Sequence, residues 1–283
     1  MSRYLLTLTL VLLSTLTQAK PFVFTAIPDV DETRLNARFT KVAHYLQQQL
    51  GVEVKYIPVK SYAAAVSAFR NKQVQLAWFG GLSGVQARRL SPGAEAIAQG
   101  EEDQFFKSYF IAHNSTGLKK SDKLSEHIKG LSFTFGSKSS TSGRLMPEYY
   151  LTKNFKQSPD QLFSRVGFSG NHSRTIALVQ SGSYQLGALN YQVWEKELAE
   201  GNIDTTKVSV IWQTPHYPDY QWTVHGDLDQ QWGKGFKQKL TQILLAIKQK
   251  NILEAFPRKR FIPADNSHYQ AIEDTARAIG LLD

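Results

Sequence analysis

The sequence predicts an α/β protein of two lobes, each built on a mainly parallel β-sheet flanked by helices. Strand-like and helix-like segments alternate through residues 21–79. The same alternation returns between about residue 119 and residue 212, and a helical tail follows it. Alternating strands and helices favour parallel sheets, and two such stretches in one chain favour two lobes.

The first lobe opens with an apolar strand over residues 21–27, which Pro28 and Asp29 end. A helix follows, because apolar residues recur at three- and four-residue steps and Gly51 is placed to end it. These apolar residues are Leu35, Phe39, Val42, Leu46 and Leu50. The alternation continues with a strand, a short helix and a strand, at residues 52–57, 61–69 and 74–79.

The second lobe has four predicted strands, near residues 131–135, 164–168, 184–189 and 208–212. Two extended segments, 107–113 and 221–225, are then the crossings between the lobes. In the tail, apolar residues fall on one face of a helix, and a further helix is predicted near 267–279. That face consists of Trp232, Phe236, Leu240, Ile243, Leu244 and Ile247. We expect the tail to pack back onto the first lobe.

The N-terminus has the pattern of a secretory signal. A positive start, Met1-Ser2-Arg3, precedes an apolar run over residues 4–16 and small residues up to Ala19, which predicts cleavage after Ala19. The run is short for a bilayer span, which disfavours the alternative of a membrane anchor. The predicted division of the chain is a signal peptide at 1–19, the first part of the first lobe at 20–112, the second lobe at 113–221, and the return to the first lobe at 222–283.

Composition excludes several classes of protein. The chain of 283 residues has no cysteine, so it has neither a disulfide framework nor a lipid-attachment cysteine. Its formal net charge is +9, but the basic residues are dispersed except at 258–260, which argues against a nucleic-acid-binding stripe. The histidines show no metal-binding spacing, and we expect no metal and no cofactor. A protein of the space between two bacterial membranes, not embedded in either, fits best.

The most informative segment is the hydroxyl loop, residues 139–142, which lies between a strand-like run and a helix-like run. Its members are Ser139, Ser140, Thr141 and Ser142. A helix start offers unpaired amide N–H groups and a positive dipole end, to which these hydroxyls add donors. The segment therefore predicts an anion site, with an ordinary Ser/Thr helix cap as the alternative.

Ligands of open α/β sheets lie outside the carboxyl ends of the strands, where three further loops stand out. The first contains Phe79, Gly80 and Gly81, whose glycines allow close approach of the backbone to a ligand or else form a plain turn. The second places His172 in the first turn of a helix, where its imidazole can donate to an oxyanion. The third contains Asn190.

One more candidate opens a helix rather than following a strand. Tyr62 begins the short helix after Ser61, where its phenol can close a site. A half-buried packing tyrosine is the equally weighted alternative at this position.

Five motifs in chain order resemble the periplasmic phosphate/phosphite/phosphonate-binding proteins of ABC transporters. They are FTAIPD at 24–29, VKSYAA at 59–64, WFGGLSG at 78–84, SSTSG at 139–143 with Pro147, and FSGNH at 168–172. The resemblance spans nearly the whole chain after residue 19. Within the family, residues 78–88 and 93–99 most resemble a branch associated with selenate binding.

The resemblance implies a two-lobed periplasmic binding fold, type II-like, that closes on a small oxyanion and delivers it to a membrane permease with its ATPase. It implies that the hydroxyl loop holds the anionic head, that His172 donates to it, and that Tyr62 closes the other side. Residues 79–81 would line the first lobe. It further implies a monomer without catalytic activity.

Two departures from the family pattern bear on the ligand. Residues 188–191 contain no acid to hold an amine, which disfavours aminophosphonates, and Trp78 and Gly81 differ from the usual loop. Selenate, sulfate, phosphate, phosphite and alkylphosphonates stay open as ligands.

Two other functions stay open as well. One is a secreted serine hydrolase, disfavoured by the absence of a Gly-x-Ser-x-Gly motif, and the other is a ligand sensor of the same fold.

Overall fold

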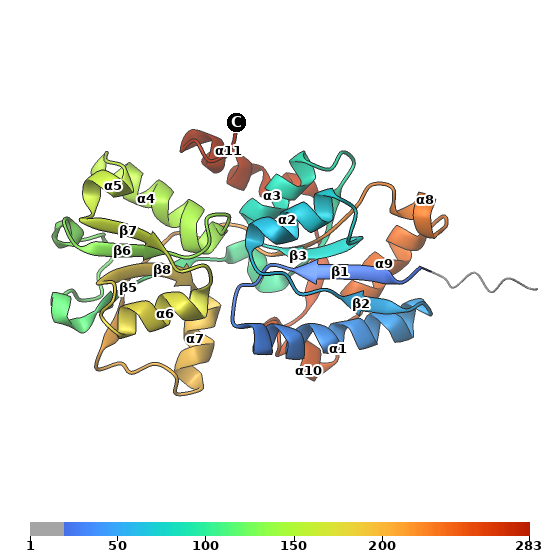
Figure 1. Ribbon diagram of the computed structural model, residues 1–283, viewed down its shortest axis with the longest axis horizontal. Coiled ribbons are helices and arrows are strands. Elements are labelled where there is room, and N and C mark those ends of the chain that lie inside the picture. Colours follow the sequence, from blue (N-terminus) through green and yellow to red (C-terminus); the bar gives the residue numbers. More distant parts are fainter. Residues whose placement is uncertain (1–19) are drawn as a thin grey trace, which may run out of the picture.

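Two β-sheets, each flanked by helices, divide the protein into two lobes (Figure 1). The structure is a computed structural model that describes residues 20–283. The predicted signal segment, residues 1–19, lies outside the described residues. The two-lobed α/β fold predicted from the sequence is confirmed, and the two ends of the described chain both belong to the first lobe (Figure 1).

The first lobe is built on a six-stranded sheet in the order β11-β4-β10-β3-β1-β2. Its strands are β1 (Phe22–Ala26), β2 (Val54–Tyr56), β3 (Leu76–Phe79), β4 (Glu95–Gly100), β10 (Gln221–Val224) and β11 (Phe261–Pro263). The first three strands pair in parallel, whereas β10 runs antiparallel between β3 and β4. Thus a strand from late in the chain occupies the middle of a sheet begun by the N-terminal segment.

The helices of the first lobe follow the local signals of the sequence. They are α1 (Glu32–Leu50), α2 (Tyr62–Arg70), α3 (Gly81–Arg89), α8 (Leu228–Trp232), α9 (Phe236–Leu245), α10 (Lys250–Leu253) and α11 (Gln270–Ala278). Asp31 caps α1 by accepting a hydrogen bond from the Arg34 amide at 3.0 Å, and Gly51 ends it at a positive φ of 75°. The apolar stripe predicted for this helix is buried against the sheet.

The tail differs from the sequence prediction in one respect. A single helical face from Trp232 to Ile247 was predicted, but Gly233 and Gly235 take positive φ values of 98° and 85° and divide the segment into α8 and α9. Glycine adopts this backbone region without the Cβ clash that disfavours it in other residues. The tail still packs on the first lobe as expected, since Trp232 meets Phe22 edge-on at 5.4 Å.

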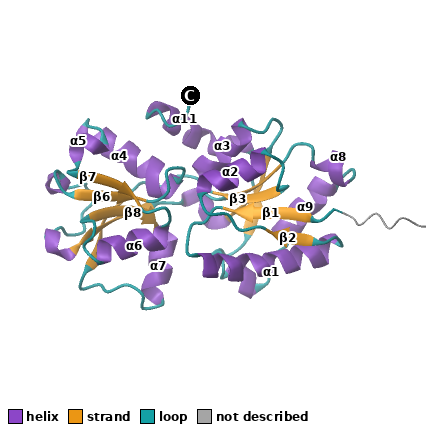
Figure 2. Cartoon of the chain, in the orientation of Figure 1, coloured by secondary structure: helices purple, strands orange, loops and turns teal. Residues whose placement is uncertain are grey.

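The second lobe is built on a five-stranded sheet in the order β7-β6-β8-β5-β9. Its strands are β5 (Ser108–His113), β6 (Ser132–Phe135), β7 (Arg165–Phe168), β8 (Leu186–Asn190) and β9 (Val208–Gln213). Its helices are α4 (Met146–Phe155), α5 (Pro159–Leu162), α6 (His172–Gln180) and α7 (Tyr191–Ala199). Figure 2 shows them on both sides of the sheet. Here β6, β7 and β8 are parallel and β5 is antiparallel to β8.

The two segments predicted to cross between the lobes are strands within the sheets instead. β5 pairs with β8 and β9 in the second sheet, so the predicted boundary between 112 and 113 falls inside a strand. β10 likewise pairs with β3 and β4. An extended, buried segment must pair its backbone groups, and the neighbouring ladders satisfy them. The crossings precede these strands, where an antiparallel bridge joins Phe106 to Tyr217.

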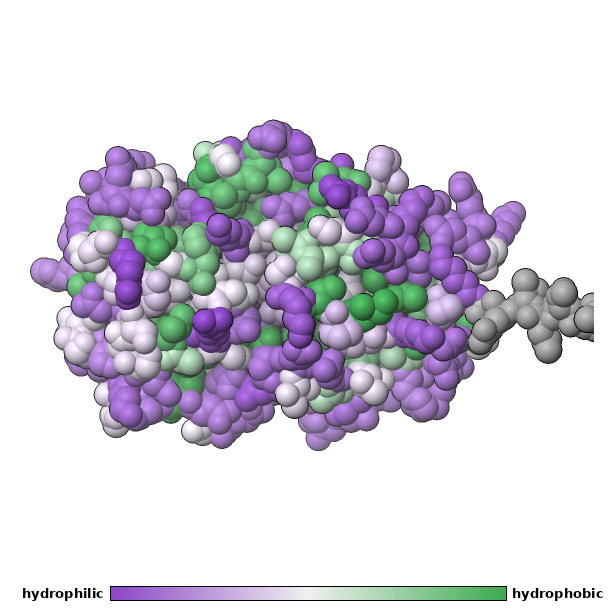
Figure 3. Space-filling model, in the orientation of Figure 1, coloured by the Kyte–Doolittle hydropathy of each residue, from purple (hydrophilic) through white to green (hydrophobic). Residues whose placement is uncertain are grey.

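The lobes are in contact rather than apart. The backbone amide of His172 in the second lobe donates to the carbonyl of Asp29 in the first at 3.0 Å. Figure 3 shows side chains of both lobes meeting across one face of the molecule. The structure is therefore that of a closed form, in which groups between the lobes are shielded from water.

Candidate functional site

Five helical segments begin where the two lobes meet. In the first lobe α2 and α3 start at Tyr62 and Gly81. In the second lobe α6, α7 and a π-helical turn leading into α4 start at His172, Tyr191 and Thr141. Each start presents amide N–H groups without intrahelical acceptors and the positive end of a helix dipole. Their meeting point favours a small anion.

We call this buried junction the cradle. The residues that form it are Asp29, Tyr62, Gly80, Gly81, Ser140, Thr141, Ser142, His172, Asn190, Asp219 and Tyr220, and all are buried. The strand ends explain its position, because β1, β3, β6, β7 and β8 each lead directly into a loop that supplies some of these residues. Candidate residues therefore lie at carboxyl ends of strands in both lobes, where the sequence analysis expects them.

The hydroxyl loop supplies the second-lobe side of the cradle. Ser140 precedes the π-helical turn, and its Oγ accepts a hydrogen bond from the Gly143 amide at 2.9 Å. This bond fixes the loop, as an N-cap does in an ordinary helix. Ser142, in the first turn, is 1% exposed. The loop thus places hydroxyl and amide donors inside the protein rather than on its surface.

Thr141 connects the hydroxyl loop to the other lobe. Its Oγ1 accepts a hydrogen bond from the Leu82 amide, in the first turn of α3, at 3.0 Å. The same hydroxyl interacts with the carboxyl of Asp219. A Cβ added at Gly80 would lie 3.4 Å from this Oγ1 and 3.1 Å from Asp219 Oδ1. Glycine at position 80 is what lets the two lobes come this close.

His172 and Tyr62 face each other across the cradle. His172 Nδ1 accepts a hydrogen bond from the Asn190 amide at 3.3 Å, which leaves the ring proton on Nε2, 3.5 Å from Tyr62 Oη. Burial lowers the pKa of His172 to about 4, so the ring is neutral at neutral pH. Burial also raises the pKa of Tyr62 well above 10. Both groups are therefore uncharged donors.

A chain of hydrogen bonds closes one side of the cradle. Asn190 Nδ2 donates to Tyr220 Oη at 3.1 Å, and Tyr220 Oη donates to Asp29 Oδ2 at 3.1 Å. Arg38 Nη1 in turn donates to Asp29 Oδ1 at 3.4 Å. The side-chain amide of Asn190 is held in place because its Oδ1 caps α7, accepting a hydrogen bond from the backbone amide of Gln192 at 2.7 Å. The chain links the lobes through side chains that are themselves fixed.

Asp219 contributes a buried carboxyl group to the cradle. Its Oδ1 accepts a hydrogen bond from the Gly81 amide at 2.8 Å, whereas its buried Oδ2 has no partner among residues 20–283. Burial raises the pKa of Asp219 to about 7, and the bond from Gly81 opposes that rise. The folded protein therefore holds the proton of this carboxyl up to a higher pH than an exposed aspartate would.

The structure brings most of the residues predicted for the site together. Tyr62, Gly80, Gly81, Ser140, Thr141, Ser142, His172 and Asn190 lie in the cradle. Two predicted residues lie differently. The ring of Phe79 packs edge-on against Phe69 at 5.6 Å within the core, and Ser139 is half-buried at the start of the loop.

Sequence reasoning missed Asp29, Asp219 and Tyr220. Asp29 follows β1 directly and was read only as the end of a strand. The other two precede β10, which is antiparallel, so its amino end lies at the edge where the parallel strands have their carboxyl ends. The absence of an acid at 188–191 therefore does not make the site free of acids, and the reason given against aminophosphonates was incomplete.

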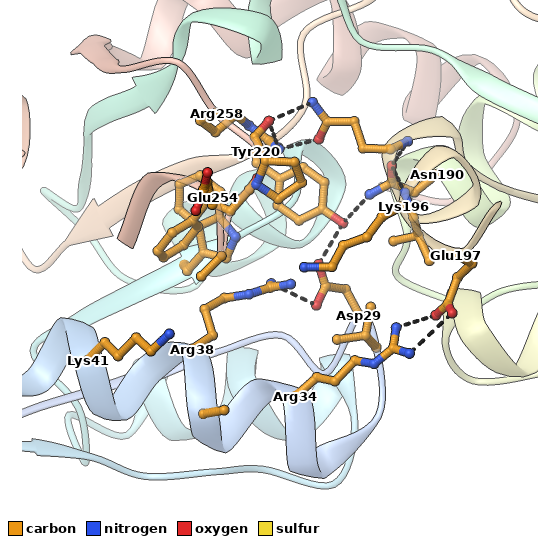
Figure 4. A pocket seen from close by; sticks show the side chains of 18 of the residues that line it. Asp29, Arg34, Arg38, Lys41, Asn190, Lys196, Glu197, Tyr220, Glu254 and Arg258 are labelled. Carbon is orange, nitrogen blue, oxygen red and sulfur yellow. Dashed lines mark hydrogen bonds and ion pairs between the residues drawn. The ribbon is translucent and has the colours of Figure 1, made fainter. Parts of the chain in front are cut away.

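A hollow adjoins the cradle at Asp29, Asn190 and Tyr220 (Figure 4). It has a volume of about 340 Å³ and is lined by α1 and the segment after α10 from the first lobe and by α7 from the second. We call it the interlobe cavity. Asp29, Asn190 and Tyr220 belong to the cradle and also line the interlobe cavity. The hydrogen-bond chain through them therefore lies between the cradle and the cavity.

Residues 20–283 contain no group of three or more His, Asp or Glu side chains that could hold a metal ion. Within the same residues, every helix is too short or too polar to cross a membrane. The cradle itself offers neutral hydrogen-bond donors, helix starts and the carboxyl groups of Asp29 and Asp219.

Comparison with known proteins identifies the family of this chain. Residues 24–269 match the family model described as "ABC transporter, phosphonate, periplasmic substrate-binding protein". A probable ABC transporter phosphite binding protein, PhnD1, from Prochlorococcus marinus is 45% identical over 90% of this chain and 88% of its own. The phosphonates-binding periplasmic protein of Escherichia coli is 26% identical over 71% of this chain and 60% of its own.

Solved structures of binding proteins share the fold of this chain. The structure of PhnD1 from Prochlorococcus marinus in complex with methylphosphonate is 44% identical, with a TM-score of 0.89 over 93% of this chain and all of that chain. A binding protein component of an ABC phosphonate transporter from Pseudomonas aeruginosa, 23% identical, shares the fold with a TM-score of 0.79 over 90% of this chain and 85% of that chain. These relatives are substrate-binding proteins, not enzymes, and so is this protein. The chain belongs to the family of periplasmic substrate-binding proteins of phosphonate ABC transporters.

Proposed function

We propose that the cradle binds a small phosphorus oxyanion, phosphite or a short alkylphosphonate such as methylphosphonate. The observation that carries the proposal is a fully buried junction of five helical starts whose side-chain donors are uncharged. Such donors hold an oxyanion by matched hydrogen bonds in a dry site. The Prochlorococcus protein, solved with methylphosphonate, supports the choice of ligand.

The carboxyl of Asp219 favours binding of a phosphorus oxyanion over binding of selenate. A phosphonate or phosphite carries an ionisable P–OH group whose proton can be shared with the unpartnered Oδ2. Selenate and sulfate have no proton to share at neutral pH, so they would bind only beside a protonated carboxyl. The selenate branch that the sequence resembles is thus the weaker of the two possibilities.

The cargo would then pass to a membrane permease with its ATPase. Ligand binding between two lobes shifts the balance toward the closed form, which is the form a permease can distinguish from the open one. We propose that motion occurs between a lobe of residues 20–107 with 221–283 and a lobe of residues 108–220, which moves the predicted boundary to the edges of β5 and β10. Since one chain supplies both sides of the cradle, the proposal needs only a monomer, exported to the periplasm after cleavage at Ala19.

Calorimetric titration of residues 20–283 tests the ligand. The panel is methylphosphonate, phosphite, phosphate, selenate, selenite and sulfate, with thermal unfolding as the second readout. A true ligand at about 100 times its Kd adds about 2.7 kcal/mol to the free energy of unfolding, which raises the Tm by several degrees. Binding of selenate or sulfate in preference to methylphosphonate and phosphite would overturn the assignment. A folded protein that binds none of the six would also overturn it.

A further inference from the structure

The interlobe cavity is large enough to hold a ligand of its own. Its volume of about 340 Å³ lies within the range of small-molecule sites, and a dry engineered cavity of less than half that size holds benzene. The chain of hydrogen bonds from Asn190 through Tyr220 to Asp29 separates it from the cradle. A molecule in this cavity would therefore not displace the oxyanion.

Arg38 is a half-buried cation with donors to spare at this cavity. Its side chain is 10% exposed, yet the one side-chain hydrogen bond it makes within the described chain is that to Asp29 at 3.4 Å. A guanidinium has five N–H donors, so most of them are available to a ligand. In Figure 4 the guanidinium extends from α1 toward the centre of the cavity.

Two lysines add positive charge from opposite sides. Lys41 extends from α1 and Lys196 from α7, so the cations come from both lobes (Figure 4). Each acid of the wall already faces a cation. These pairs are Asp29 with Arg38 at 3.4 Å, Glu197 with Arg34, Glu200 with Arg34 at 3.4 Å and with Lys196 at 3.8 Å, and Glu254 with Lys250 at 3.5 Å. Lys41 makes no ion pair within residues 20–283, and Arg38 and Lys196 keep N–H donors beyond those that face these acids.

Part of the remaining wall is apolar. Trp78, Val193 and Phe256 line the cavity together with the ring of Tyr220. All four are buried. A ligand that satisfies both parts of the wall has an anionic head for Arg38 and the lysines and a small apolar body for the rings. A planar carboxylate matches the fork of a guanidinium best.

We infer that the interlobe cavity is a second site, which binds a small organic carboxylate between Arg38, Lys41 and Lys196. Because α1 and α7 belong to different lobes, the complete site exists only in the closed form. A carboxylate there stabilises that form and strengthens oxyanion binding in the cradle, and the reverse holds by linkage. This coupling rests on the proposed function of the cradle, whereas the carboxylate site itself does not.

The test uses benzoate as the carboxylate and benzamide as its neutral counterpart of the same shape. Methylphosphonate is titrated into the protein calorimetrically with either compound present. Saturation-transfer nuclear magnetic resonance reports binding of benzoate without methylphosphonate. The variants are Lys41→Met, Lys196→Met and the double variant, which keep the length of the side chain. The matched control is Lys120→Met, an exposed lysine of the second lobe away from the cavity.

We expect benzoate, but not benzamide, to lower the Kd of methylphosphonate about fivefold. The double variant should lose this effect and the resonance signal, while Lys120→Met keeps both. Equal effects of benzoate and benzamide, an unchanged double variant, or competition between benzoate and methylphosphonate would overturn the inference. If methylphosphonate does not bind, the proposed ligand of the cradle fails. The carboxylate site is then tested separately, by saturation transfer to benzoate in the unsubstituted protein and its loss in the double variant.

Discussion

Thr141 Oγ1 accepts a hydrogen bond from the Leu82 amide at 3.0 Å, so a hydroxyl from one lobe satisfies a helix start of the other. Neither group could find this partner in an open form. The bond therefore belongs to the closed state and lies inside the cradle. It makes Thr141 a contact between the lobes as well as a candidate ligand contact, a double role that the sequence did not indicate.

Replacing Thr141 by Val tests this role. The substitution keeps the shape of the side chain and removes the hydroxyl, which leaves the Leu82 amide without its acceptor. We expect methylphosphonate binding to weaken by about 1–3 kcal/mol, because a buried donor loses its partner. Calorimetry measures the change, and Thr205→Val, at an exposed position, is the control. Unchanged affinity would remove Thr141 from the site.

Asp219 predicts a pH dependence of stability. Burial raises the pKa of its carboxyl to about 7 in the folded protein, so the folded state holds a proton that the unfolded state releases above its ordinary value near 4. The contribution of Asp219 to the free energy of unfolding therefore falls as pH rises from about 4 to 7. Asp219→Asn should abolish this component in urea unfolding across that range. If the free energy of unfolding of Asp219→Asn changed with pH as much as that of the unsubstituted protein, the raised pKa of Asp219 would be contradicted.

His172 predicts the opposite slope. Burial lowers its pKa to about 4, so between about pH 4 and 6.5 the unfolded state binds a proton that the folded state does not. Its contribution makes the protein less stable as pH falls through this range, by up to about 3 kcal/mol. His172→Asn should flatten this part of the profile, and His44→Asn, at an exposed position, should not. If His172→Asn lost stability as steeply as the unsubstituted protein when the pH falls, groups other than His172 would be responsible for that loss.

The ion pair between Arg34 and Glu197 predicts an effect on closure. The guanidinium reaches from α1 to the buried carboxylate on α7, where Nη2 and Oε2 are 3.2 Å apart. Arg34→Gln, Glu197→Gln and the double variant form a cycle, and we expect a coupling of about 1 kcal/mol in methylphosphonate affinity. Lys60→Gln is the control, since its exposed pair with Glu32 stays within the first lobe. A coupling near zero would show that the pair does not contribute to closure.

Much of the fold could be predicted because the local signals agree with the global arrangement. The stripe from Leu35 to Leu50 predicted the buried face of α1, and the glycine at position 51 predicted where the helix ends. The crossings were wrong, because β5 and β10 have the same extended pattern whether they join lobes or pair in a sheet. Pairing of strands distant in sequence leaves no local signal.

The grouping of the candidate residues could be predicted where a strand runs into a loop of distinctive residues, as at Thr141 and His172. It could not be predicted at Asp219 and Tyr220, because their place depends on the antiparallel direction of β10. The neutral state of His172 was likewise out of reach, since it follows from burial in the closed form. Sequence patterns report composition and period, whereas these properties come from tertiary contacts.

The position of β10 between β3 and β4 also has a consequence for how the chain folds after export. The second lobe is one continuous stretch and can form as soon as it emerges, but the first sheet stays divided until residues 221–224 arrive. A chain cut short before β10 would leave the edges of β3 and β4 unpaired and open to aggregation. Completion of the first lobe thus depends on the last quarter of the chain.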